Sequence, residues 1–199
     1  MEKRNRIYKA VKRALDVFFS LLGLIVCLPF IPVFWIIIKL DSPGSMLFRQ
    51  RRAGKNAKLF TLYKLRTMRP DAPRNVPTHM LQNSNSHITK LGAFLRRSSL
   101  DEMPQLINIL RGDMSVVGPR PALWNQDDLI ALRETNGANS VRPGLTGLAQ
   151  IMGRDELPIE VKAAYDGEYV QKMSFFFDLR IVIKTVTSVI SAKGIKEGR

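Results

Sequence analysis

The sequence predicts a mainly helical α/β protein that begins with one broken membrane helix. Three observations support this fold class. The stretch Val17–Ile38 carries no charged residue and contains two prolines. Basic residues are dense on both sides of it, and a β-hairpin pattern and amphipathic helical patterns follow. We divide the chain into residues 1–40, a membrane helix with a basic N-terminus, and residues 41–199, a domain associated with the membrane surface.

Length and charge limit the classes of function. The chain has 199 residues and a formal net charge of +14, which fits one domain with a small appendage. Such a basic balance suits nucleic acid, anionic lipid or a phosphate-rich substrate. Cys27 is the single cysteine, so a reducing compartment is expected. The two histidines, His79 and His87, are expected in a loop and have no partners at metal-ligand spacing, which disfavours a zinc site.

The uncharged stretch has the length of a membrane helix. At ~1.5 Å per residue, Val17–Ile38 would extend roughly 33 Å, about the thickness of the hydrocarbon core of a bilayer. Pro29 and Pro32 each remove a helical hydrogen bond, so a kink or break is expected near residues 25–29. The alternative, a buried helix of a soluble protein, is disfavoured by the length of the apolar stretch.

Charge predicts how this helix lies in the bilayer. Under the positive-inside rule, a spanning helix has one flank that is poor in Lys and Arg. Here both flanks are rich: the basic residues are Lys3, Arg4, Arg6, Lys9, Lys12 and Arg13 before the stretch, and Lys39, Arg49, Arg51, Arg52, Lys55, Lys58, Lys64 and Arg66 after it. A helix that breaks at Pro29 and Pro32 and returns to the same leaflet accounts for both observations. We predict this re-entrant form, facing the cytoplasm.

The following elements are a hairpin, a loop and several helices. Apolar runs at 46–48 and 59–63 around a Gly-Lys-Asn turn predict a β-hairpin. Residues 70–87 are rich in Pro, Asn, Ser and His, which predicts a long loop. Residues 89–97 have apolar and basic residues at helical spacing, which predicts an interfacial amphipathic helix. Two more helices are expected at 155–170 and from 175 to about 190, the second too short and too charged to span a bilayer.

Two adjacent acids, Asp101 and Glu102, lie where a further helix is expected to begin. Ser99 and Glu102 have the spacing of a capping box, and Pro104 is tolerated only in a first turn. Gly112 then predicts the end of the helix. The arginines at 96 and 97 predict a lowered pKa for Asp101. The acids are either ordinary first-turn residues or part of a site.

Two arginines lie in stiff loops built from proline and glycine. Arg120 is flanked by prolines and follows the strand-like pair at 116–117, and Arg142 precedes Pro143-Gly144. A rigidly placed guanidinium suits bidentate binding of phosphate, and Thr146 and nearby backbone amides suit an anion too. The alternative is a pair of proline turns with incidental arginines. Together with the acidic pair in a basic membrane protein, these loops suggest a diphosphate substrate.

Several motifs then match one family in order along the chain. Residues 95–121, which contain Leu-Asp-Glu-Met-Pro-Gln-Leu, Gly-Asp-Met-Ser and Gly-Pro-Arg-Pro, closely resemble the small monotopic polyprenyl-phosphate phosphoglycosyl transferases, the bacterial sugar transferases. Further matches are Phe48-Arg49-Gln50, Tyr63-Lys64 with Arg66-Thr67-Met68, the segment around Arg142, and Tyr165 to Leu179. The chain departs from the family at one position, because Leu28 precedes Pro29 where small members often carry serine.

The resemblance implies a re-entrant helix and catalysis by the Asp-Glu pair. We assign Asp101 as the nucleophile that forms a covalent phospho-sugar intermediate, and Glu102 as its helper. The expected metal is Mg²⁺, held by these two carboxylates. Arg96, Arg120, Arg142 and Thr146 are the expected phosphate-binding residues. Pro29 and Pro32 form the expected helix break.

The expected reaction moves a sugar-1-phosphate from a UDP-sugar to undecaprenyl phosphate and releases UMP, the first membrane step of polysaccharide biosynthesis. The implied partners are these two substrates, membrane lipid and downstream glycosyltransferases, at the cytoplasmic face of a bacterial inner membrane. The sugar and the oligomeric state stay open. The alternative is a non-catalytic basic protein that binds the membrane surface or polyprenyl phosphate. We expect no nucleic-acid partner, since nucleic-acid binding explains neither the apolar stretch nor the acidic pair.

Overall fold

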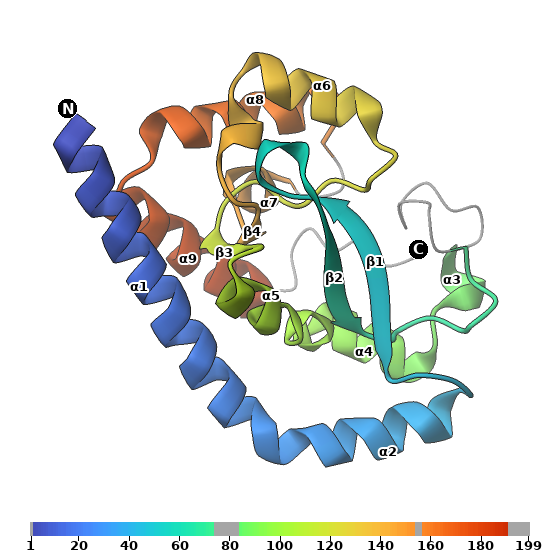
Figure 1. Cartoon of the computed structure of the whole chain (residues 1–199). Helices are drawn as coiled ribbons and strands as arrows, with labels where there is room; N and C mark the ends of the chain where they lie inside the picture. Colours follow the sequence, from blue (N-terminus) through green and yellow to red (C-terminus); the bar gives the residue numbers. More distant parts are fainter. Residues whose placement is uncertain (1, 74–83, 154–156, 191–199) are drawn as a thin grey trace.

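A computed structural model describes residues 2–73, 84–153 and 157–190 (Figure 1). The N-terminal and hairpin elements are α1 (Glu2–Cys27), η1 (Leu28–Phe30), α2 (Ile31–Asp41), β1 (Leu47–Ala53), η2 (Lys55–Ala57) and β2 (Leu59–Leu65). The central elements are α3 (Ser84–His87), α4 (Lys90–Arg97), η4 (Leu100–Glu102), α5 (Gln105–Arg111) and β3 (Ser115–Val117). The C-terminal elements are α6 (Asp127–Thr135), η5 (Ala138–Ser140), β4 (Gly144–Thr146), α7 (Leu148–Met152), α8 (Ile159–Lys172) and α9 (Phe175–Ile190). The predicted mainly helical fold with a small β-hairpin is confirmed.

The long apolar helix breaks where the two prolines predict. α1 gives way to the 3-10 turn η1, with Pro29 inside it, and α2 begins at Ile31 with Pro32 in its first turn. The helices meet at an open angle, and the hairpin, α4 and α5 lie on the inner side of the bend (Figure 1). Arg6–Asp41 is long and apolar enough to cross a membrane, and only 6% of its most apolar window is buried in the protein.

The hairpin is longer than the sequence predicts. β1 and β2 pair antiparallel in the register Phe48 to Lys64 and Arg52 to Phe60. The prediction rested on the apolar runs at 46–48 and 59–63, whereas the basic run after Phe48 also belongs to β1. Arg49 and Arg51 are exposed and Gln50 between them is buried, which is the alternation of a strand with one face in water. The turn closes at Asn56, whose positive φ of 54° suits asparagine.

The segment after α4 corrects the capping prediction. Thr89 caps α4 by accepting a hydrogen bond from the Gly92 N–H at 2.9 Å. Ser99, by contrast, adopts a left-handed conformation with φ of 57°, and its side chain caps nothing among the described residues. The chain makes the 3-10 turn η4 and enters α5 at Gln105, with Pro104 just before it. The capping box is therefore wrong, whereas Gly112 ends α5 in the left-handed conformation as predicted.

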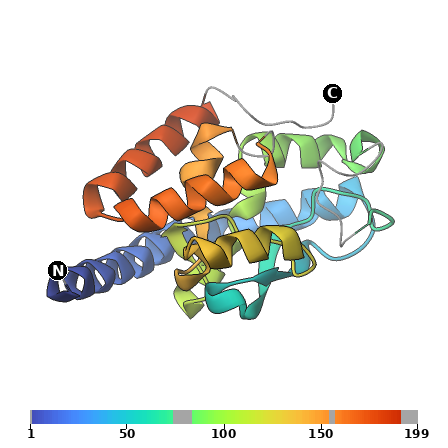
Figure 2. The same ribbon diagram turned by 90° about the horizontal axis from the view of Figure 1, so that it is seen from above.

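Two short strands, β3 and β4, pair in parallel in the C-terminal half of the chain. The sequence analysis did not predict this pairing. β3 pairs with β4, with Ser115 opposite Gly144 and Val117 opposite Thr146. Tyr169 of α8 and Ile181 of α9 pack with Val117 in one buried cluster. Seen from above, α9 and the hairpin lie on opposite faces of the molecule (Figure 2). The helices expected at 155–170 and from 175 onward are confirmed as α8 and α9, with α8 starting later.

Two expectations fall partly outside the described residues. His79 lies outside them, and so does the predicted end of the last helix beyond residue 190. In the described part of the expected loop at 70–87, the last four residues form the short helix α3, which ends at His87. His87 Nδ1 lies 3.6 Å from the exposed carboxylate of Asp71. This contact is local to the loop.

Candidate active site

The acidic pair lies in η4, between two helices that fix its position. Asp101 is buried, with 6% of its surface exposed. The left-handed Ser99 ends α4 and begins the turn η4, whose two carboxylates both lie within reach of Lys64 on β2. Gly92 permits this arrangement, because a Cβ at that position would collide with the backbone of Thr67. α4 therefore packs against the end of the hairpin, and the acids follow directly from it.

Lys64 of β2 links the two carboxylates. Its Nζ lies 2.8 Å from Glu102 Oε1 and 3.5 Å from Asp101 Oδ2. Arg120 approaches the same Glu102 oxygen from the proline-rich loop, with Nη1 and Nη2 both at 3.2 Å. Glu102 thus carries two cationic partners, whereas the ion pair of Asp101 within the described structure is the longer one to Lys64.

This difference separates the pKa values of the two acids. Burial raises the pKa of Asp101 most, and the neighbouring Glu102 raises it further; Lys64, Arg96 and Arg120 lower it without offsetting the rise. The prediction of a lowered pKa for Asp101 is wrong because desolvation outweighs the flanking arginines. Burial also acts to raise the pKa of Glu102, but Lys64 and Arg120 together bring it below its usual range.

Arg96 belongs to the site through Thr67. Its Nε donates to Thr67 Oγ1 at 2.8 Å, and its charge lowers the pKa of Asp101. The structure therefore gathers Arg96, Arg120 and Lys64 around the acidic pair. In the sequence, Lys64 was noted only among the basic residues after the apolar stretch and in the Tyr63-Lys64 match to the family. The strand pattern places it at the end of β2, but nothing local in the sequence shows which acid it meets.

Arg142 and Thr146 lie elsewhere in the contacts that the structure records. Arg142 Nε donates to the Gly112 carbonyl at 2.7 Å, at the C-terminal end of α5, whereas the acids precede the N-terminal end. Thr146 is buried in β4, and its Oγ1 lies 2.6 Å from Thr185 Oγ1 of α9. Both residues hold elements together here, and their predicted phosphate contact stays a prediction.

The donor set at the acidic pair suits a metal only in combination with a substrate. Within the described ranges, no group of three or more His, Cys, Asp and Glu side chains gathers at one point. Mg²⁺ is commonly held by one or two carboxylates together with substrate phosphates, and not by a cage of protein ligands alone. Asp101 and Glu102 fit the first arrangement, although Lys64 competes for the same Glu102 oxygen.

The helix break lies directly beneath this site. Cys27 Sγ at the end of α1 is 3.1 Å from Met103 Sδ, one residue after Glu102. Gly23 allows the helices to approach, since a Cβ there would be 2.9 Å from Leu106 Cδ1 of α5. The same helix pair exposes large apolar side chains, including Phe19, Val26 and Trp35. The acids therefore lie beside the break of a helix pair whose exposed surface is rich in apolar side chains.

Comparison with known proteins identifies the family of the chain. The model of the family described as bacterial sugar transferase matches residues 7–192. The chain belongs to the bacterial sugar transferase family. This finding confirms the resemblance inferred from the motifs between residues 95 and 121. It also makes the chain a member of a family of enzymes.

Relatives within the bacterial sugar transferase family cover most of the chain. The exopolysaccharide production protein PSS of Rhizobium leguminosarum bv. phaseoli is 40% identical over 193 residues, which cover 91% of this chain and 96% of the relative. The exopolysaccharide production protein ExoY of Rhizobium meliloti is 39% identical, covering 92% and 87%. The UDP-glucose:undecaprenyl-phosphate glucose-1-phosphate transferase of Caulobacter vibrioides is 42% identical over 190 residues, covering 90% and 70%.

Proposed function

We propose that this sugar transferase moves a sugar-1-phosphate from a UDP-sugar to undecaprenyl phosphate, releases UMP, and uses Asp101 as the nucleophile. The observation that carries the proposal is the unequal pairing of the buried Asp101 and the partly buried Glu102. Glu102 accepts from Lys64 and Arg120, whereas Asp101 is bound less closely. A carboxylate with a raised pKa is the more basic and the better nucleophile of the two.

The reaction then proceeds in two displacements at one phosphorus atom. An Asp101 oxygen attacks the β-phosphorus of the UDP-sugar, the bond to the bridging oxygen breaks, and its electron pair leaves with UMP. A phosphate oxygen of undecaprenyl phosphate next attacks the same phosphorus. The Asp101 carboxylate leaves with its electron pair, which restores the enzyme and yields undecaprenyl-diphospho-sugar.

The cationic residues reduce the repulsion between an anionic nucleophile and an anionic substrate. Arg96 and Arg120 flank the acids and supply guanidinium groups suited to phosphate oxygens. Lys64 orients Glu102 and lowers the pKa of both acids. Mg²⁺ held by Asp101, Glu102 and the diphosphate would supply further charge neutralisation at the phosphoryl group.

The membrane arrangement that supports this reaction is a re-entrant helix pair. The globular domain contacts both ends of the pair: Lys12 of α1 donates to Asp178 of α9 at 2.7 Å, and Arg66 donates to the Ile38 and Ser42 carbonyls at the end of α2. One domain that holds both ends lies on one side of a bilayer. We place that side at the cytoplasmic face of the bacterial inner membrane, where the basic flanks belong.

A coupled assay tests the proposed function. Purified enzyme is incubated with undecaprenyl phosphate, Mg²⁺ and, in turn, UDP-glucose, UDP-galactose, UDP-N-acetylglucosamine and UDP-N-acetylgalactosamine, and UMP is measured. We expect UMP release with one donor class, and a fall of at least about 10³-fold in Asp101→Asn, since the nucleophile is lost. Near wild-type UMP release by Asp101→Asn would exclude the nucleophile assignment. No release with any donor would favour the non-catalytic binding protein.

A further inference from the structure

One helical turn beyond the acidic pair, a buried side-chain amide has a donor without a hydrogen-bond partner among the described residues. Gln105 is the first residue of α5 and only 2% of its surface is exposed. Its Nε2 is buried and has no hydrogen-bond partner among the described residues. Buried polar groups in native proteins are almost always paired, and an unpaired donor destabilises the folded state. Such a group therefore calls for a functional explanation.

The backbone places Gln105 one turn after the acidic pair and on the same side of the chain as Glu102. Met103 and Pro104 have right-handed helical φ and ψ values, so the chain is helical from η4 into α5. The hydrogen bonds of this segment join residues three apart, as from the Met103 N–H to the Leu100 carbonyl and from the Leu106 N–H to the Met103 carbonyl. In this 3-10 geometry residues three apart lie on one face, which places Gln105 on the side of Glu102. A helical side chain also leans toward the N-terminus of its helix. The amide of Gln105 is therefore directed toward the turn that carries Asp101.

Asn108, the next polar residue on this side of α5, shows that this side faces strand β2. Asn108 is fully buried, accepts from the Tyr63 N–H at 3.1 Å and donates to the Thr61 carbonyl at 2.7 Å. Lys64, the next residue of β2, reaches Asp101. Gln105 thus lies between two points where this helical face contacts the same strand. Asn108 uses its amide to bind β2, whereas the N–H groups of Gln105 Nε2 have no partner among the described residues.

We propose that the Gln105 amide donates a hydrogen bond to a non-bridging oxygen of the phosphoryl group while that group is transferred to and from Asp101. This inference rests on the proposed function. The packing around the amide limits its orientations before the substrate arrives, and its N–H has no partner to give up among the described residues, so it is available to stabilise negative charge on that oxygen. It forms and breaks no covalent bond. Its contribution is to the rates of both displacements and not to the binding of the nucleotide, and the rate of UMP release reports the first of them.

Shape-matched variants test this role. Gln105→Met removes the amide but keeps an unbranched side chain, and Gln105→Glu keeps the shape but replaces the donor with a carboxylate. The control is Ser20→Ala, which removes another buried and unpaired polar atom, the Ser20 hydroxyl on α1. The readouts are the pre-steady-state rate of UMP release from the active UDP-sugar, the KM for that donor, and the Tm of each protein.

The expected pattern is a loss of rate without a loss of binding or stability. In Gln105→Met we expect the rate of UMP release to fall by roughly 10²-fold to 10³-fold, the range for one lost oxyanion donor, with little change in KM. The Tm should stay the same or rise, because no hydrogen bond of the fold is broken. Gln105→Glu should lose at least as much rate, and Ser20→Ala should retain the wild-type rate.

Other outcomes overturn the inference in distinct ways. A Gln105→Met enzyme with the wild-type rate would show that the amide does not contact the phosphoryl group. Unfolding of both Gln105 variants would show that the amide is paired within the fold. In each of these cases an active wild-type enzyme leaves the proposed function intact. An inactive wild-type enzyme with every UDP-sugar would overturn the proposed function and the inference together.

Discussion

At the scale of single residues, two adjacent acids with the same charge acquire opposite pKa shifts. Asp101 is buried beside one ammonium group at 3.5 Å, whereas Glu102 binds Lys64 and Arg120 through one oxygen. Desolvation dominates for Asp101 and Coulomb attraction for Glu102, so the first pKa rises and the second falls. Under the proposed mechanism, the first acid supplies the nucleophile and the second fixes the cations around it.

Lys64→Met should shift the pH profile of the enzyme. Lys64 lowers the pKa of Asp101, so its removal raises that pKa further, and more of the nucleophile is protonated at a given pH. The acid side of the profile for UMP release should therefore move to higher pH, with lower activity at neutral pH and partial recovery above it. Lys58→Met, an exposed lysine near the turn of the same hairpin, is the control. An unshifted profile would contradict the pairing of Lys64 with Asp101.

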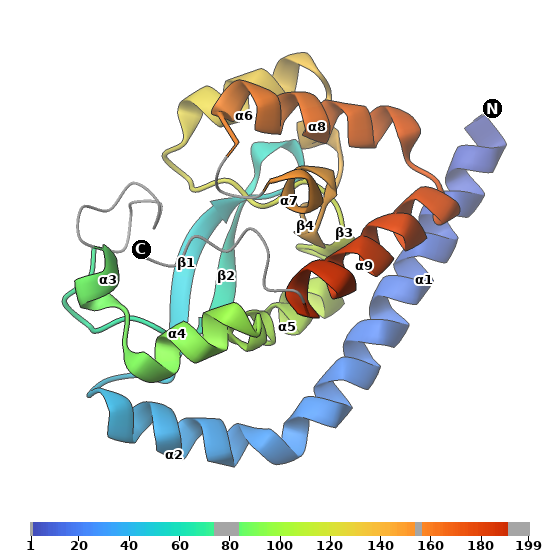
Figure 3. The ribbon, with the colours of Figure 1, turned by 180° about the vertical axis from the view of Figure 1, so that it is seen from behind.

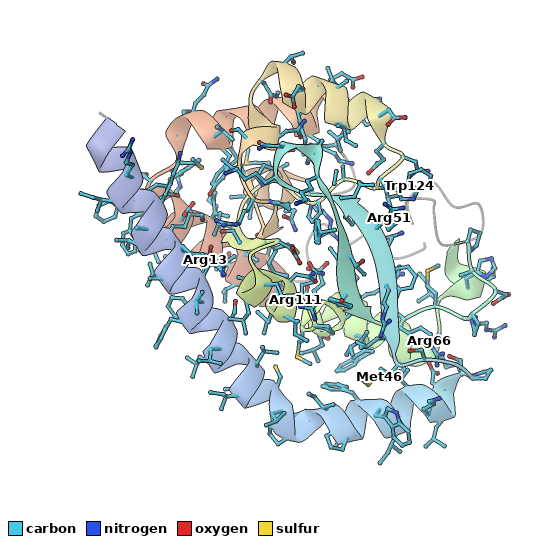
Figure 4. All side chains as sticks on the ribbon, in the orientation of Figure 1. Arg13, Met46, Arg51, Arg66, Arg111 and Trp124 are labelled. Carbon is cyan, nitrogen blue, oxygen red and sulfur yellow. The ribbon has the colours of Figure 1, made fainter. Side chains whose placement is uncertain are left out.

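At the scale of elements, α5 is held at its C-terminal end by two arginines from distant segments. Arg13 of α1 donates to the Ile109 carbonyl at 2.6 Å and to the Leu110 carbonyl at 2.9 Å, and Arg142 donates to Gly112. Cations suit this end because the last carbonyls of a helix are unpaired and carry partial negative charge. Arg13 lies on the side of α1 that faces α5 (Figure 4). The membrane helix therefore sets the position of the short helix that follows the acids.

Arg13→Met should loosen this connection. Loss of two hydrogen bonds to helix-terminal carbonyls should lower the free energy of unfolding by about 1–3 kcal/mol. A lower Tm and a lower rate of UMP release are expected. Lys9→Met changes an exposed lysine one turn earlier on the same helix and should change neither. Thermal unfolding in matched detergent provides the measurement. Equal Tm values for Arg13→Met and wild type would show that the contact does not contribute to stability.

At the scale of the whole molecule, the apolar surface extends over more than the broken helix. α9 exposes Phe175, Phe176, Leu179, Ile183 and Val186, and α4 exposes Phe94. Seen from behind, α9 runs beside α1 (Figure 3), where Tyr8 and Lys12 donate to Asp178. The exposed apolar side chains of these helices suit a membrane interface, which was predicted for residues 89–97, and α9 also packs on the core through Ile181.

The re-entrant arrangement predicts that both ends of the helix pair are accessible from one side. In a Cys27→Ala background, Lys9→Cys and Asp41→Cys place thiols at exposed positions near the two ends. A membrane-impermeant maleimide should label both thiols in inverted inner-membrane vesicles and neither in intact spheroplasts. Labelling of the two positions from opposite sides would show that the helix spans the bilayer.

Much of the fold could be predicted because its causes are local. Proline sterics gave the break at Pro29 and Pro32, alternation gave the hairpin, and helical periodicity gave α4, α8 and α9. The capping box at Ser99 failed because Ser99 adopts the left-handed conformation at the end of α4, where its side chain caps nothing among the described residues. The β3–β4 pair was missed because a parallel bridge between residues 115 and 146 leaves no pattern within either segment.

The sequence by itself determined the broken apolar helix, the basic flanks and the adjacency of Asp101 and Glu102. These features depend on residue type and on short-range backbone sterics. Only the tertiary structure decided that Lys64 joins the two acids, that Arg142 caps α5 at the other end, and that Gln105 keeps an unpaired donor. Burial and ion pairing depend on distances between segments far apart in the chain. Those distances set which acid has the raised pKa.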